Sequence, residues 1–213
     1  MNNPFYIFVL GRPGSGKSAL YKRLSRRLTD EGISSDITRV DDYPKLEAKW
    51  DDARARSDYS RLKPTDDGSY IITDEKIYDE MLQELSSDLT GLAVRGRIIF
   101  IEFSRPDNLR ALKNFSQQIL SNALAIYLDV SFETCWQRNV DRIKRLKDQG
   151  IDAHYVPKER MEKSYGKDDK DQLMAESPIP VVSIPTEERD AFNELDKGIE
   201  KALEKIKEIR SLP

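Results

Sequence analysis

The sequence feature that most constrains the fold is a glycine-rich octapeptide, Gly11-Arg12-Pro13-Gly14-Ser15-Gly16-Lys17-Ser18, near the start of the 213-residue chain. It follows a continuous apolar, β-prone run, Phe5 to Leu10, and precedes a segment in which Leu20, Leu24 and Leu28 recur at the spacing of a helix. Glycines let a backbone wrap around a phosphate with its N–H groups pointing inward, and a helix N-terminus favours anions. A strand, this loop and a helix in that order predict a phosphate-binding loop for a nucleoside triphosphate.

Each residue type in the loop has a mechanical role. We expect Lys17 to reach the β- and γ-phosphates and Ser18 to offer its hydroxyl to Mg²⁺. The expected cofactors are therefore ATP, or another nucleoside triphosphate, and Mg²⁺. The residues expected to contact the nucleotide are Gly11, Pro13, Gly14, Ser15, Gly16, Lys17, Ser18 and Ala19.

The rest of the chain alternates strand-like apolar runs with amphipathic helices. We expect strands at 5–10, 35–40, 98–101, 123–130 and 179–184, and helices at 17–31, 74–89, 108–120, 187–210 and after Ser131. This alternation predicts an α/β fold of the P-loop NTPase type, a three-layer sandwich in which helices cover both faces of a five-stranded parallel sheet. Within this single domain we expect an acceptor-side insert at 41–96, with 41–70 as a highly charged cap, and a lid at 135–170. Residues 150–177 read as polar and irregular.

Composition and charge narrow the partners. Lys and Arg total 35 against 38 Asp and Glu, so the net charge of −3 provides no global attraction for polyanions, and we do not expect a nucleic-acid partner. The longest apolar run is too short to cross a bilayer, and the single cysteine, Cys135, excludes an internal disulfide. We therefore expect a cytoplasmic protein without a membrane partner, and the oligomeric state is left open.

Acidic residues follow two predicted strands at the edge where open α/β sheets bind ligands. Glu102 ends the buried run 98–101, as a Walker-B acid does, and is expected to hold Mg²⁺ directly or through water. The alternative is a structural salt bridge, for instance to Arg105. Asp41 and Asp42 end the second strand, where one of them could be a general base, orient a substrate hydroxyl, bind Mg²⁺ through water, or simply form a turn.

Three arginines, Arg138, Arg142 and Arg145, are spaced four and three along the helix expected after Ser131 and so share one face. Guanidinium groups are suited to neutralise the charge that develops on a transferred phosphoryl group. The alternative is a solvated basic face. The nearly opposite face carries apolar residues that can pack: Trp136, Val140 and Ile143.

Together these motifs resemble the P-loop nucleoside and nucleotide kinase group. Gly11 to Ser18 resembles the adenylate-kinase style of loop. Asp41-Asp42-Tyr43 resembles the end of strand two in uridine-kinase-like and nicotinamide-riboside-kinase-like proteins, where an Asp contacts the acceptor hydroxyl. The segment Tyr127 to Cys135, with the arginines that follow, is similar to the lid-helix entry of deoxynucleoside kinases. The chain departs from that last group at Glu102-Phe103-Ser104-Arg105, where those kinases have Glu-Arg-Ser, and in carrying Asp where their base is usually Glu.

The resemblance implies a small-molecule kinase that transfers the γ-phosphoryl of ATP to a hydroxyl or phosphate acceptor, either nucleoside-like, nucleotide-like or another metabolite. The residues expected to carry catalysis are Lys17, Asp41, Asp42, Arg138, Arg142 and Arg145. Two rival hypotheses are a regulatory module that slowly hydrolyses a nucleoside triphosphate and a kinase of a protein or nucleic-acid end. The identity of the acceptor, and any role of the only histidine, His154, are not readable from the sequence.

Overall fold

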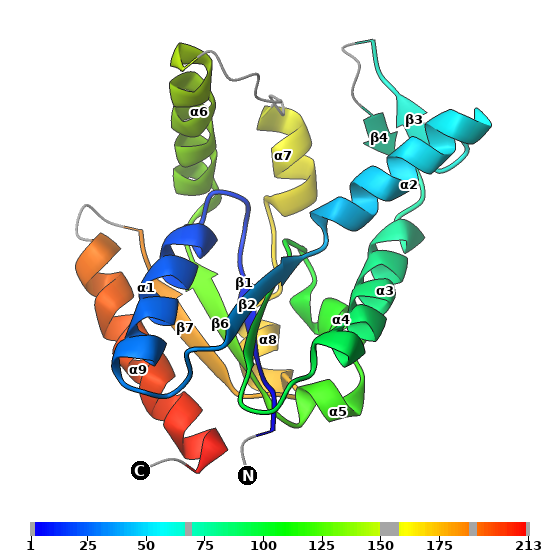
Figure 1. The fold of residues 1–213 in the computed structure, drawn as a ribbon. Helices are drawn as coiled ribbons and strands as arrows, with labels where there is room; N and C mark the ends of the chain where they lie inside the picture. Colours follow the sequence, from blue (N-terminus) through cyan, green and yellow to red (C-terminus); the bar gives the residue numbers. More distant parts are fainter. Residues whose placement is uncertain (1–2, 67–69, 150–157, 188–190, 212–213) are drawn as a thin grey trace.

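A computed structural model describes residues 3–66, 70–149, 158–187 and 191–211. Its centre is a five-stranded parallel sheet with the strand order β2-β5-β1-β6-β7 (Figure 1). These strands are β1 (Phe5–Leu10), β2 (Ile37–Asp41), β5 (Ile98–Glu102), β6 (Ala123–Asp129) and β7 (Val181–Pro185). The predicted five-stranded parallel sheet of an α/β sandwich is thereby confirmed.

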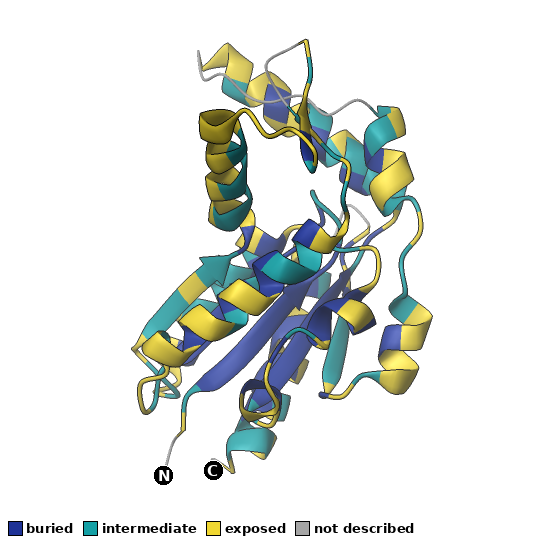
Figure 2. Cartoon of the chain, turned by 90° about the vertical axis from the view of Figure 1, so that its right-hand side faces the viewer, coloured by how far each residue is buried: buried dark blue, intermediate teal, exposed yellow. Residues whose placement is uncertain are grey.

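Two helical layers cover the sheet because side chains alternate along each strand. On β1, Phe5, Ile7 and Val9 pack into one layer, whereas the residues between them pack into the other. The first layer contains α1 (Lys17–Asp30) and α9 (Ala191–Arg210). The second contains α3 (Lys76–Leu92), α4 (Asn108–Leu112), α5 (Gln117–Leu120) and α8 (Lys170–Glu176). Figure 2 shows the central strands buried between exposed outer helix faces.

The register places the candidate site at the carboxyl edge of the sheet. Val9 pairs with Glu102, and Glu102 pairs on its other side with Asp41. The phosphate loop follows directly after β1, so it begins at the level where β5 and β2 end. The acids that end two strands are thus brought beside the loop, as the topology of a parallel sheet predicts.

The charged cap expected at 41–70 contains regular structure. It forms α2 (Tyr43–Arg56) and an antiparallel hairpin of β3 (Leu62–Pro64) and β4 (Tyr70–Ile72). A small separate core forms where Leu62 packs with Met81 of α3, against Leu46 and Trp50 of α2. This unit stands above the sheet edge opposite α6 (Phe132–Asp148) and α7 (Lys158–Tyr165) (Figure 1).

Two other expectations need correction. The helix predicted over 108–120 is broken into α4 and α5, because Phe115 between them is buried against the β1 side chain Phe8, with ring centroids 4.7 Å apart. The segment 150–177, expected to be irregular, contains α7 and α8 in its described part. No helix in the described ranges is long and apolar enough to span a membrane.

A close approach of α9 to β7 gives a test of the packing. A Cβ at Gly198 would lie 2.4 Å from the Ile184 side chain, so Gly198→Ala should lower the free energy of unfolding by about 1–3 kcal/mol through overpacking. This loss should outweigh the ~1 kcal/mol helix-propensity gain of alanine. Gly91→Ala in α3 is the matched control, since nothing lies within 4 Å of its Cβ, and it should be neutral or stabilising in urea unfolding. Equal effects of the two substitutions would contradict the packing.

Candidate active site

The loop between β1 and α1 has the backbone of an anion cradle. Gly11, Gly14 and Gly16 have φ values of 131°, 86° and 105°, which side-chain-bearing residues rarely adopt. A Cβ at Gly14 would lie 2.5 Å from the Cys135 carbonyl oxygen of α6, whereas around Gly16 nothing lies within 4 Å. The loop therefore packs tightly on its α6 side and leaves space at the N-terminus of α1, where free N–H groups favour a phosphate.

Other loop residues have definite places in this cradle. Within the described part of the chain, Ser15 Oγ is buried without a hydrogen-bond partner. The Pro13 carbonyl accepts a hydrogen bond from Asn139 Nδ2 of α6 at 3.0 Å, and Ala19 N–H bonds to the Gly16 carbonyl at 2.9 Å. An orphaned hydroxyl beside open backbone N–H groups fits a ligand rich in acceptor oxygens, such as a nucleoside triphosphate.

Lys17 carries a buried positive charge at the centre of the site. Its Nζ donates to the carbonyls of Gly11 (3.0 Å) and Arg12 (2.9 Å) and to Ser104 Oγ (2.8 Å), and the side chain is almost fully buried. Burial lowers the pKa of Lys17 from 10.5 to about 8, and nearby Glu102 partly offsets this effect. The three oxygens occupy all three ammonium donors, so a phosphate would have to replace one of them.

Ser18 and Glu102, the predicted metal ligands, both contact the guanidinium group of Arg39. Arg39, on β2, places a guanidinium nitrogen 2.5 Å from Glu102 Oε2 and 3.4 Å from Ser18 Oγ. The expected alternative partner of Glu102, Arg105, is not the one that it binds. A position that already holds a positive group between a hydroxyl and a carboxylate fits Mg²⁺. The described residues contain no cluster of three or more acid, His or Cys ligands.

The two acids that end β2 have different environments. Asp42 is buried and forms an ion pair with Arg105, and burial raises the pKa of its carboxyl, with the arginine opposing the shift. Asp41 accepts a hydrogen bond from the backbone N–H of Tyr43 at 3.0 Å, the turn contact considered from the sequence. Both acids line a cavity of about 360 Å³. The remaining lining residues are Tyr43, Leu46, Tyr78, Met81, Glu102, Phe103, Ser104, Arg105 and Tyr165.

Of the three arginines predicted to face the phosphates from α6, Arg138 reaches the phosphate loop. The helix begins after Ser131, whose Oγ accepts the Thr134 N–H at 3.2 Å, so the predicted cap is confirmed. Arg138 donates to the Thr186 carbonyl at 2.6 Å and reaches the Ser15 carbonyl at 3.5 Å. The structure thus brings Arg138 to the edge of the phosphate loop.

Arg142 and Arg145 are exposed and bond within their own helix. Arg142 donates to Asn139 Oδ1 at 3.0 Å, and Arg145 contacts the Asp141 carbonyl at 3.4 Å. Their roles toward phosphate therefore remain predictions. His154 lies outside the described residues.

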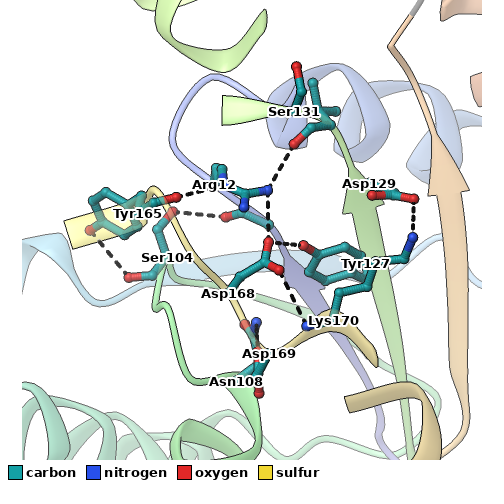
Figure 3. A network of polar contacts seen from close by, with 12 residues as sticks. Arg12, Ser104, Asn108, Tyr127, Asp129, Ser131, Tyr165, Asp168, Asp169 and Lys170 are labelled. Carbon is teal, nitrogen blue, oxygen red and sulfur yellow. Dashed lines mark hydrogen bonds and ion pairs between the residues drawn. The ribbon is translucent and has the colours of Figure 1, made fainter. Parts of the chain in front are cut away.

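Sequence reasoning assigned no role to Arg12, which proves to be a hub (Figure 3). Its guanidinium donates to the carbonyls of Tyr165 (2.7 Å) and Val130 (2.9 Å) and forms an ion pair with Asp168 at 2.7 Å. Tyr127 of β6 donates to the same Asp168 carboxylate. The loop residue therefore fastens the end of α7 to the sheet.

The neighbouring residues extend this attachment (Figure 3). Lys170 donates to Asp129 at 2.6 Å, and the Asp169 carboxylate accepts from Asn108 Nδ2 at 2.7 Å. These partners lie 41 and 61 residues apart in the chain, so no local spacing could have revealed them.

Comparisons with known proteins agree with this geometry. The family model described as "AAA domain" matches residues 7–164, and the chain belongs to this family, whose fold here is that of P-loop kinases. A gluconokinase from Sinorhizobium meliloti 1021 is similar with a TM-score of 0.59 and 12% identity over 97% of each chain. The Mycobacterium tuberculosis APS kinase, solved with AMPPNP and APS, is similar with a TM-score of 0.52 and 16% identity over 96% of this chain and 98% of that one. At such identities the likeness shows the shared fold.

The lowered pKa of Lys17 predicts proton uptake on nucleotide binding. Above pH 8 the buried amine is largely neutral, and bound phosphates should raise its pKa again. Calorimetry of ATP-analogue binding in buffers of different ionisation enthalpy should show most of one proton taken up at about pH 9 and little at about pH 7. Lys17→Met should abolish the uptake and most of the affinity while the protein stays folded. Equal proton uptake by the wild type and Lys17→Met would contradict this assignment.

The same shift has a consequence for stability. The unfolded chain holds the Lys17 proton up to about pH 10.5 while the folded chain releases it near 8, so the unfolded state binds more protons in this window. The contribution of Lys17 to the free energy of unfolding therefore rises from pH 8 to 10.5. The difference between wild type and Lys17→Met across this range measures it.

The Arg12–Asp168 contact is tested by a double-mutant cycle. Both side chains are mostly buried, so Arg12→Met with Asp168→Asn should give a coupling energy of about 1–3 kcal/mol in urea unfolding. The exposed pair Arg26–Asp30, 3.5 Å apart on α1, is the control and should give about 0.5 kcal/mol or less. Similar coupling energies for the two pairs would show that Arg12 does not fasten the lid segment.

Proposed function

We propose that this chain is an ATP-dependent kinase that transfers the γ-phosphoryl group to a small acceptor held in the cavity beside the phosphate loop. The observation that carries the proposal is the position of Ser104. Its Oγ bonds to Lys17 Nζ at 2.8 Å, and the same residue lines the 360 Å³ cavity. Lys17, which we expect at the phosphates, is thus one hydrogen bond from the wall of a cavity large enough for a small molecule.

In this proposal the cradle and Lys17 bind the triphosphate and balance its charge. Ser18 and Glu102 hold Mg²⁺, which when bound neutralises charge on the phosphate oxygens. The arginines of the lid supply further positive charge. Catalysis is then mostly positioning and electrostatic stabilisation, because phosphoryl transfer asks little covalent chemistry of the protein.

We assign Asp41 to the acceptor hydroxyl, as orienting group or base, and Asp42 to positioning. Asp42 is committed to Arg105, whereas Asp41 carries no ion pair within the described ranges and faces the same cavity. An in-line attack requires the acceptor oxygen on the far side of the γ-phosphate from its leaving oxygen. The end of β2, one strand beyond β5, borders that space.

The fold neighbours support two ligands in such a site. The APS kinase was solved with AMPPNP and APS, and a shikimate kinase from Acinetobacter baumannii, with a TM-score of 0.50 and 16% identity over 94% of each chain, was solved with shikimate. In our proposal the segment 41–96 is the acceptor side and 135–170 the lid of a single domain. We also propose a cytoplasmic location.

The direct test is an acceptor screen with labelled ATP and Mg²⁺. A small compound that raises ADP formation and becomes labelled supports the kinase proposal. If a broad panel gives no stimulation and a partner protein or nucleic-acid end does, the kinase of small molecules should be abandoned for a regulatory module or a macromolecular kinase.

The two aspartates should separate in mutagenesis. Asp41→Asn should cut transfer by about 10²–10⁴-fold while nucleotide affinity is retained, or by less if the carboxylate only orients the hydroxyl. Asp42→Asn should lower the free energy of unfolding, because it leaves the Arg105 charge buried without its partner. Chemical denaturation and turnover with the acceptor found in the screen measure both effects. Wild-type turnover by Asp41→Asn would remove it from the reaction.

The lid arginines are tested by kinetics. Arg142→Met and Arg145→Met should lower kcat, by up to about 10²-fold, more than they raise the Kd for ATP, because the charge they would balance develops in the transition state. Arg138→Met should change both quantities, since Arg138 also braces the loop backbone at Ser15. Lys144→Met, exposed on the same helix, is the control. Unchanged kcat in all three arginine variants would support the alternative, a solvent-exposed basic face without a catalytic role.

A further inference from the structure

The charges that line the cavity are unequal. Among the lining residues, Asp41, Asp42 and Glu102 are acidic, and Arg105 is the single base. Arg105 is bound to Asp42, and Arg39, from outside the lining, is bound to Glu102. Asp42 and Glu102 are therefore each balanced by an arginine, and each of these two arginines already forms an ion pair.

The unbalanced group is Asp41. Within the described part of the chain it forms no ion pair, and its hydrogen bond comes from the Tyr43 N–H. Arg105 is only 10% exposed, and its guanidinium lies 4.4 Å from the centroid of the Tyr78 ring. Two of its nitrogens donate to Asp42 and to the Ser104 carbonyl, and the nitrogen without a partner among the described residues, Nε, is buried, so Arg105 offers little to an anionic ligand. An anion that entered this space would meet the Asp41 carboxylate, and the nearest cations, Arg105, Arg39 and Lys17, already have hydrogen-bond partners in the chain.

Two further arginines of the acceptor side are already paired with acids. Arg56 pairs with Asp52 at 2.8 Å, and Arg61 pairs with Asp74 and Glu80, both at 2.8 Å. None of these groups lines the cavity. The other walls are apolar or aromatic, chiefly Leu46, Tyr78, Met81, Phe103 and Tyr165.

We propose that the acceptor is an uncharged or positively charged hydroxyl compound with an apolar or ring-containing body, and that the cavity rejects compounds bearing a phosphate, sulfate or carboxylate group. A buried anion without a cation partner is costly, and here it would also face Asp41. An ammonium group would instead find a carboxylate and aromatic rings, both favourable to a cation. That the ligand is a phosphoryl acceptor rests on the proposed function, but the charge preference depends only on the residues that line the cavity.

The charge preference can be measured without knowing the acceptor. Leu46→Cys places a thiol in the cavity wall, and the native Cys135 is buried, with its pKa raised to about 11 by burial, so it should not react. The rates of modification by a trimethylammonium-ethyl and a sulfonato-ethyl methanethiosulfonate are compared in the nucleotide-free protein. Each rate is divided by the rate of the same reagent with free 2-mercaptoethanol. Met174→Cys, on the exposed face of α8, is the surface control.

The cationic reagent should react at least about tenfold faster than the anionic one with the Leu46→Cys thiol, as expected for one uncompensated charge in a partly screened site. Adding Asp41→Asn should reduce this ratio at least about threefold, with little change at the surface control. A ratio near one, or a preference for the anionic reagent, would overturn the proposal.

A second measurement uses matched acceptors that differ only in charge: glucose, glucosamine, gluconate and glucose 6-phosphate, with adenosine and AMP as a ring-bearing pair. For any skeleton that is phosphorylated, the neutral or ammonium member should be used at least about tenfold better, by kcat/KM, than the anionic member. Preference for an anionic member would overturn the inference. The thiol rates decide the charge selectivity even if no member is phosphorylated, and such a failure would count against the proposed function alone.

Discussion

The site depends on one buried positive charge. The Lys17 ammonium lies where the phosphate loop meets the end of β5, and removing it from water would be costly without the oxygens of Gly11, Arg12 and Ser104. Those oxygens come from the loop backbone and from a residue two positions beyond β5, so they coincide only when β5 pairs beside β1 in the observed register. The site therefore forms only when the strands pair in this way, and burial still lowers the pKa of the amine to about 8.

What the sequence could predict follows from what is local. The segments 5–10 and 98–101 are continuous apolar runs, and the glycines and Lys17 of the loop act through spacing within eight residues, so both were readable. The break at Phe115 was not, because a single side chain turns inward to meet β1 and interrupts a good helical pattern. Arg39 was not identified either, since an arginine on a half-buried edge strand has no motif, and its meaning appears only beside Ser18 and Glu102.

At the carboxyl edge of the sheet, two arginines form ion pairs with two acids. Arg39 lies between Ser18 and Glu102. Arg105, which follows β5, forms an ion pair with Asp42 just after β2. The cation in each of these pairs is an arginine of the chain itself. This arrangement keeps acidic groups close together at modest cost, because the Glu102 and Asp42 carboxylates each have a counter-charge. Asp41, which forms no ion pair with any residue that the structure describes, is correspondingly the group most able to respond to a ligand.

The phosphate loop also contacts both α6 and α7. Near the middle of α6, Asn139 donates to the Pro13 carbonyl and Arg138 reaches the Ser15 carbonyl, while at the end of α7 Arg12 binds the Tyr165 carbonyl and the nearby Asp168. Movement of either helix at these contacts would disturb that loop. Any change of the loop backbone on binding phosphate would therefore be transmitted to both attachments through direct contacts. Since Tyr165 also lines the cavity, the same residues connect the phosphate loop, α7 and the wall of the cavity in one contiguous network.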